Sequence, residues 1–378
     1  MSDVSDLLIF GIVVGLRLFV PLLIPRFPLP SIIAALVIDA VDQTVFQQFT
    51  NLDLDGYQTY DKALDIYYLT IAYVATMRNW GGGFAFKVGR FLWYYRLVGV
   101  VIFEQTQYRW LLLVFPNTFE YYFIAIEAIR LRYNPLSFSH RRIIAIAASI
   151  WIFIKLPQEW WIHVAKLDFT NAVKQHVFGV EPEAKWGEAV TNRPLVSLLL
   201  VLAVVGIGIA IRMLKRRMPV TPWESSYDSD VHNSRLGWNA PAKSAQPTAT
   251  FGVSFIEKAV LIGLVSTIFA MILPGVEAGP LAVIVAVAVL IAGNTVVSEL
   301  FARREISWNS AVKQFVAMVA VNLLLFFVWN ALSSGNETPL PIAVTLFSVG
   351  LITLLTVLFD RYRDIGVTHR LEKAVVTE

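Results

Sequence analysis

The sequence predicts an all-α integral membrane protein, a polytopic bundle of about eleven transmembrane helices. Hydrophobic residues make up 56% of the 378 residues and charged residues only 16%, whereas soluble globular chains carry roughly 25% charged residues. Several apolar runs reach the roughly 20 residues that a helix needs to cross a hydrocarbon core of about 30 Å. These runs lack the alternating pattern of a barrel strand, so helices, which pair their own backbone groups, must form the spans.

The first apolar run follows the acidic start Met1–Asp6 directly. A cleaved signal peptide has a basic start, a shorter apolar stretch and a small-residue cleavage site. None of these features is present, so we predict a retained first helix. The predicted spans are 5–24, 28–49, 60–78, 90–106, 110–130, 140–156, 194–213, 252–273, 279–299, 311–332 and 339–359.

Two polar stretches separate groups of spans. Residues 157–193 are too polar to cross and rich in tryptophan, which predicts an amphipathic segment in the outer membrane interface. Residues 214–250 are rich in Pro, Ser, Asn and charge, which predicts an irregular cytoplasmic linker. The chain is thereby divided into a polar-cored part of seven spans, 1–213, and an apolar part of four spans with a short cytoplasmic tail, 251–378.

Basic residues predict the orientation. Lys and Arg concentrate on alternate connections between spans, and the positive-inside rule then places the N-terminus outside and the C-terminus in the cytoplasm. We expect a plasma membrane of bacterial type. The basic run Lys215–Arg217 indicates attraction to anionic membrane lipid and not to nucleic acid. The absence of cysteine excludes disulfides, thiolate metal sites and cysteine nucleophiles.

Acidic side chains occur on two neighbouring predicted spans, where a charge is costly unless it faces a cavity or a partner. On each span the polar residues recur at i, i+3 or i+4 and therefore share one helix face. The two stripes are Asp39, Asp42 and Gln43 on the second span and Asp61, Asp65 and Tyr68 on the third. Because the two spans are antiparallel neighbours, we expect the four carboxylates to face one another in the outer half of the membrane.

Four carboxylates at this separation cannot all stay ionised and unpaired. A cation must join them, a basic side chain must pair with them, or some must stay protonated. Arg17 and Arg96 lie within the first and fourth spans, and we expect Arg96 to be the counter-charge. Asp39 and Asp65, the deeper pair, are the candidate ligands for a divalent cation. The structural alternative is a salt-bridge lattice that holds the helices together.

Two further acids, Glu120 and Glu127, lie on the fifth predicted span. An ionisable side chain within a span requires a partner or marks a functional path. We expect each glutamate either to pair with Arg17 or Arg96 or to contact a substrate.

Two shorter patterns are compatible with a metal ion. Glu159 and His163 are separated by four residues, as two ligands on one helix turn would be, although a solvated amphipathic face has the same pattern. Asp53 and Asp55 could hold a divalent cation together with a diphosphate, but Asp residues before a Gly are also common in turns.

Three classes of function fit these observations. The leading hypothesis is a transport or channel-like protein whose outward-facing carboxylate cluster binds an ion or a small solute. The alternative is a membrane enzyme that acts at the outer face on a lipid-linked or phosphate-bearing substrate, with a divalent cation as cofactor. The third is a non-catalytic subunit of a larger membrane assembly, either a homo-oligomer or a hetero-oligomer.

Overall fold

The computed structural model describes residues 2–51, 57–81, 83–134, 137–165, 169–182, 184–217, 226–235, 253–272, 288–295, 308–333 and 342–376. Every regular element in these ranges is a helix. Within them, seven helical segments are long and apolar enough to cross a membrane. The predicted all-helical class is therefore confirmed, and the long apolar helices fit the predicted membrane protein.

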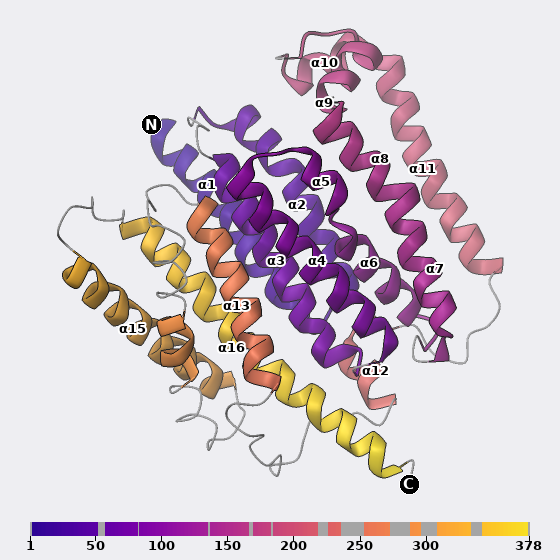
Figure 1. The fold of residues 1–378 in the computed structure, drawn as a ribbon. Coiled ribbons are helices and arrows are strands. Elements are labelled where there is room, and N and C mark those ends of the chain that lie inside the picture. The colour runs from indigo at the N-terminus through magenta and orange to yellow at the C-terminus, as the bar shows by residue number, and fades with distance from the viewer. Residues whose placement is uncertain are drawn as a thin grey trace.

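The first four long helices pack together, with α3 in contact with the other three (Figure 1). They are α1 (Ser2–Phe19), which continues into the 3-10 turn η1 (Val20–Leu23), then α2 (Pro28–Phe49), α3 (Tyr57–Asn79) and α4 (Phe84–Thr106). Pro28 opens α2 at a position where the missing N–H costs nothing. Residues 71–75 of α3 are fully buried. Protein therefore surrounds this part of α3.

The fifth predicted span, 110–130, is broken. It consists of α5 (Trp110–Val114) and α6 (Thr118–Arg130), separated by three non-helical residues around Pro116. Proline lacks the N–H that a continuous helix needs and clashes with the preceding turn. The expectation of one uninterrupted helix was wrong for this reason.

The sixth predicted span ends later than expected. One continuous helical segment runs through α7 (His140–Ile150), the π-helical turn η3 (Trp151–Lys155), α8 (Leu156–Glu159) and the π-helical turn η4 (Trp160–Val164). Pro157 does not stop it, because the proline occupies the first turn of α8 after the wider π turn. The predicted boundary at 156 was therefore wrong. The remainder of 157–193 contains the short α9 (Phe169–Ala172), η5 (Val173–Phe178) and α10 (Trp186–Asn192).

The remaining helices are α11 (Pro194–Arg217), α12 (Ser229–Arg235), α13 (Val253–Ile272), a helical segment at 288–295, α15 (Trp308–Ser333) and α16 (Ile342–Val376). α16 packs against α3, and α13 packs against both α3 and α4. The two predicted parts therefore share one hydrophobic core. A polar contact joins α15 to α16, where the buried Asn322 donates to the Thr353 hydroxyl at 2.8 Å.

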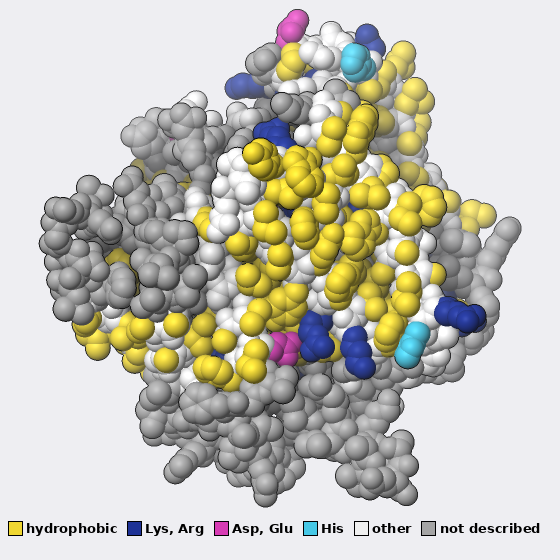
Figure 2. Space-filling model, viewed as in Figure 1, with side chains coloured by type: hydrophobic (Ala, Val, Ile, Leu, Met, Phe, Trp, Pro, Cys, Tyr) yellow, Lys and Arg dark blue, Asp and Glu magenta, His cyan; other side chains and the backbone are white. Residues whose placement is uncertain are grey.

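The surface agrees with a membrane location. Apolar side chains cover the middle of the face shown in Figure 2, and charged side chains lie toward its two ends. The apolar stretch Pro194–Met213 of α11 buries none of its residues within the chain, which fits a helix that faces lipid. α1 begins at the end of the bundle that also carries α9 and α10, while α12 and the end of α16 lie at the opposite end (Figure 1).

Candidate functional site

Arg17 is the centre of the acidic cluster. Its guanidinium contacts all four predicted aspartates: Asp39 at 2.5 Å, Asp42 at 2.5 Å, Asp65 at 2.7 Å, and Asp61. Three helices supply these side chains, because α1 packs against both α2 and α3. The expected convergence of the two acidic stripes is thus present in the structure. We name these five residues the Arg17 cluster.

The Arg17 cluster has a buried half and an accessible half. The side chains of Arg17 and Asp42 are each 3% exposed, whereas those of Asp39, Asp61 and Asp65 are 28%, 35% and 39% exposed. The three accessible residues each offer a carboxylate oxygen within 4.8 Å of the others. Arg17 and Asp42 therefore form a buried ion pair beside a group of three partly exposed carboxylates.

The expected counter-charge was wrong. Arg96 donates to the backbone carbonyl of Phe115 at 2.9 Å, at the break between α5 and α6. Arg17, and not Arg96, is the counter-charge of the aspartates. The turn η1 leads the chain from α1 directly into α2, and α1 packs against α2. Gln43, the third member of the predicted stripe on α2, is exposed, and its backbone N–H donates to the Asp42 carboxylate.

Glu120 lies in a second polar group. Its members lie on separate predicted spans, which the sequence did not indicate would meet. The Tyr68 hydroxyl donates to Glu120 at 2.5 Å, the Asn117 amide donates to it at 3.0 Å, and the ammonium of Lys155 lies 3.7 Å away. Pairing of Glu120 with Arg17 or Arg96 was therefore a wrong expectation. Lys155 lies next to the predicted end of the sixth span, at 156, yet its side chain is only 4% exposed inside the bundle.

Glu159 belongs to the same region of the bundle. It accepts a hydrogen bond from the Asn117 backbone N–H at 3.3 Å and lies 3.1 Å from His163. Its side chain is only 7% exposed, so Glu159 does not lie on a solvated helix face, which was one of the two alternatives from the sequence. The candidate acids Asp53 and Asp55 lie outside the described residues.

Glu127 forms a third polar group, toward the end of the bundle that carries α12. Arg130 donates to both of its carboxylate oxygens, at 2.9 and 2.8 Å, and the Trp80 indole donates at 2.6 Å. Of the two alternatives expected for Glu127, pairing with Arg17 or Arg96 was therefore also wrong. The local i, i+3 spacing of Glu127 and Arg130 was the signal that could have found this pair.

The predicted linker contributes α12, which docks onto this third group. Arg130 donates to Asn233 at 3.5 Å, and Asn233 donates to Asn79 of α3 at 3.4 Å. Arg26 lies 3.2 Å from Asp228, and the Ser229 N–H donates to the Arg26 carbonyl at 2.8 Å. Ser229, His232 and Asn233 are at most 5% exposed. An irregular linker was predicted, but tertiary contacts order this part of it.

Docking of α12 is expected to depend on pH through His232. Burial, together with the positive charges of Arg130 and Arg235, lowers the pKa of His232 below its usual 6.5, so the docked side chain is neutral. A released histidine binds a proton below about pH 6.5, so docking is favoured above that pH and weakens as pH falls below it. Hydrogen exchange over residues 226–235, corrected for its intrinsic pH dependence, should therefore accelerate between about pH 7.5 and pH 5.5. In His232→Gln the corrected rate should be independent of pH, and a pH dependence equal to that of the wild type would contradict this assignment.

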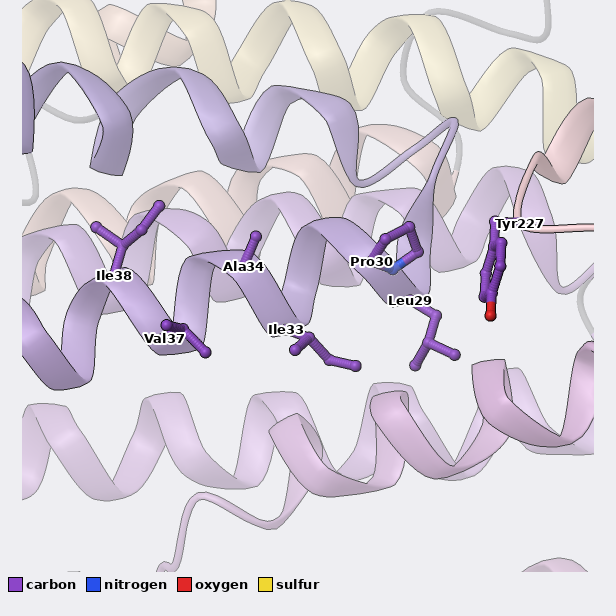
Figure 3. A pocket seen from close by; sticks show the side chains of 7 residues that line it. All are labelled: Leu29, Pro30, Ile33, Ala34, Val37, Ile38 and Tyr227. Carbon is purple, nitrogen blue, oxygen red and sulfur yellow. The ribbon is translucent and has the colours of Figure 1, made fainter. Parts of the chain in front are cut away.

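An apolar groove of about 550 Å³ lies on the surface of α2. One face of α2 from Leu29 to Ile38 lines it, with Tyr227 at one end (Figure 3). Its lining is hydrophobic apart from the tyrosine hydroxyl, and it contains none of the predicted site residues. The groove is therefore an apolar surface and not the polar site.

Comparisons of the chain with models of protein families, with curated proteins and with solved structures find no match. Function has therefore to be inferred from the residues and their contacts.

Proposed function

We propose that this chain is a membrane transport protein in which the Arg17 cluster binds a cation. The ligands are the three accessible carboxylates of Asp39, Asp61 and Asp65, and Arg17 with Asp42 is the fixed pair beneath them. The bound species is a metal ion or, where no metal competes, protons shared among the carboxylates.

The charge of the cluster carries this proposal. Four carboxylates surround one guanidinium, so full ionisation leaves an excess of negative charge in the cluster. A purely structural lattice gains nothing from this excess, because like charges at this separation repel one another. Carboxylate oxygens from two helices that converge on a small volume are the ligands that hard cations prefer. Intramembrane carboxylates are typical of ion paths and proton relays.

The difference between the two ends of the bundle also supports transport. The Arg17 cluster retains accessible surface, whereas the Glu127 group is closed off by α12. Between them lies a buried aromatic layer that includes Tyr73, Trp93, Phe119, Tyr122 and Phe123. This arrangement fits a state that is open on one side and closed on the other, as alternating access requires.

The proposal includes the topology predicted from the sequence: about eleven spans, with the N-terminus outside and the C-terminus in the cytoplasm of a plasma membrane. The chain has no cysteine, so single-cysteine variants can report the side of each segment. We expect a membrane-impermeant maleimide to label Thr191→Cys on α10 in intact cells and Ser234→Cys on α12 only after permeabilisation. Both residues are exposed, so access to the reagent does not limit either reaction. The reverse pattern would overturn the orientation, and labelling of both from one side would overturn the odd number of spans.

Cation binding by the purified protein tests the proposed function. Mg²⁺, Ca²⁺, Mn²⁺ and Na⁺ are titrated individually against the protein in detergent, with proton release monitored in weak buffer. The expected result is saturable binding of at least one cation with release of protons, because a bound cation displaces protons shared by the carboxylates. Asp39→Asn should weaken this binding at least tenfold. The proposal would be contradicted if the protein bound none of these cations and if Asp39→Asn left its proton equilibrium unchanged.

A further inference from the structure

The apolar groove on α2 begins beside an ion pair, at the end of the bundle that carries α12. We propose that this groove binds a phospholipid with a primary ammonium headgroup, of the phosphatidylethanolamine class. One acyl chain lies in the groove, and the phosphate and ammonium of the headgroup contact Arg26 and Asp228. We name the groove and these two residues the lipid site. It shares no residue with the Arg17 cluster and therefore does not depend on the proposed function.

The groove has the size and lining that an acyl chain requires. Its volume is about 550 Å³, and apolar side chains of α2 from Leu29 to Ile38 line it (Figure 3). This stretch of helix spans about 14 Å, close to the roughly 15 Å that one leaflet contributes to the hydrocarbon core. α2 begins at Pro28 and is long and apolar enough to cross a membrane. Its first turns are therefore expected at the depth where headgroups meet acyl chains.

An ion pair lies at the Tyr227 end of the groove. Arg26 precedes Leu29 by three residues, and its Nε lies 3.2 Å from the Asp228 carboxylate. Asp228 directly follows Tyr227, and the Ser229 N–H donates to the Arg26 carbonyl at 2.8 Å. The chain that leads into α2 and the chain that leads into α12 therefore meet at the mouth of the groove.

The charges at this mouth are balanced, which favours a zwitterionic headgroup. Arg26 pairs with Asp228, and the neighbouring Arg78 pairs with Asp230. An anionic headgroup would add a negative charge that no remaining positive charge offsets. A phosphodiester joined to an ammonium group carries the same two charges as the Arg26–Asp228 pair. Each charge of such a headgroup therefore meets its opposite.

The two residues also retain hydrogen-bonding capacity. The Arg26 side chain is 63% exposed and contacts Asp228 through Nε, so its two terminal nitrogens can donate to phosphate oxygens. The Asp228 side chain is 22% exposed and accepts from Arg26 and from the Asp230 N–H. A carboxylate has roughly four acceptor positions, which leaves room for an ammonium N–H.

Tyr227 supplies a further donor. It is 55% exposed, and the described residues make no hydrogen bond with its hydroxyl. In Figure 3 this hydroxyl points to the same side of α2 as the side chains of Leu29 and Ile33. A phosphate or ester oxygen at the mouth of the groove can therefore accept from it.

A photoreactive acyl chain distinguishes the lipid site from ordinary contact with bilayer lipid. The protein is placed in phosphatidylcholine nanodiscs with a trace of phosphatidylethanolamine, phosphatidylcholine or phosphatidylglycerol, each carrying the same diazirine-bearing chain. Labelling of residues 29–38 is divided by labelling of Pro194–Met213 in α11, which buries none of its residues within the chain. The ratio should be about tenfold higher for the ethanolamine probe than for the choline probe, because choline has no N–H to donate to Asp228. The glycerol probe, which lacks an ammonium group, should show no preference.

Four variants locate the preference. Arg26→Gln and Asp228→Asn should each lower the ratio for the ethanolamine probe severalfold. Ala34→Phe places a ring in the groove and should lower the same ratio without changing the ion pair. Arg141→Gln is the matched control, because Arg141 is an exposed arginine at the start of α7, and it should leave the ratio unchanged.

Several outcomes would overturn the lipid site. They are equal ratios for the three probes, a higher ratio for the glycerol probe, a ratio that neither Arg26→Gln nor Ala34→Phe lowers, and an equal loss in Arg141→Gln. Because Ala34→Phe leaves Arg26 and Asp228 in place, the test stays decisive even if a change at the mouth releases α12.

Discussion

Replacing Arg17 by glutamine is expected to cost about 3–5 kcal/mol of stability and to abolish transport, because removing one partner of a buried charged group leaves the other charges uncompensated. Glutamine keeps hydrogen-bond donors but removes the positive charge that contacts all four carboxylates. The free energy of unfolding in detergent, measured above about pH 7, gives the magnitude. The protein should also unfold less cooperatively if α1 separates from α2 and α3.

Arg96→Gln is the matched control for this experiment. Both arginines lie on helices within the bundle, but the described hydrogen bond of Arg96 is to a backbone carbonyl, and of the acidic side chains its charge acts on Glu159. Its loss should cost about 1.5–3 kcal/mol, as for a hydrogen bond made by a charged group. Combining Arg17→Gln with Asp42→Asn should restore part of the lost stability, because the second change removes one of the uncompensated charges. A cost for Arg96→Gln equal to that for Arg17→Gln would contradict the assigned roles.

Replacing Asp65 by asparagine is expected to abolish cation-dependent activity while leaving stability close to normal. Asp65 is the most accessible member of the Arg17 cluster, at 39% exposure, and the cluster already carries more negative than positive charge. Removing one charge therefore relieves repulsion, so the free energy of unfolding should stay the same or rise. Cation affinity should fall by at least tenfold, which corresponds to about 1.4 kcal/mol.

Stability and cation binding together separate a binding site from a structural lattice. In a lattice, Asp65→Asn would lower stability by a few kcal/mol and Arg17 would lose a needed partner. Asp228→Asn is the control, because Asp228 pairs with Arg26 at the opposite end of the bundle and should not affect cation binding. If Asp65→Asn changes neither cation binding nor stability, the Arg17 cluster is not the site.

Much of the acidic cluster was predictable because its information is local. Asp39 and Asp42 on one helix, and Asp61 and Asp65 on the next, share faces by their spacing alone. Adjacent antiparallel helices joined by a short connection must then lie side by side. Which arginine pairs with the aspartates could not be predicted from neighbouring residues in the sequence. Arg17 and Arg96 lie at comparable positions along their predicted spans, and only the packing of α1 against α2 and α3 distinguishes them.

The same distinction applies to the rest of the chain. The sequence by itself determined the membrane location, the helical class and the two acidic stripes, because hydrophobic length and helical periodicity are properties of short segments. Only the tertiary structure decided which partners the charged side chains have. Lys155 reaches Glu120 because the helix containing η3 and α8 continues past the predicted end of its span. Asn233 reaches Arg130 because α12 folds back under the bundle. Pairings between residues far apart in the chain depend on how the helices pack, and no local pattern encodes that packing.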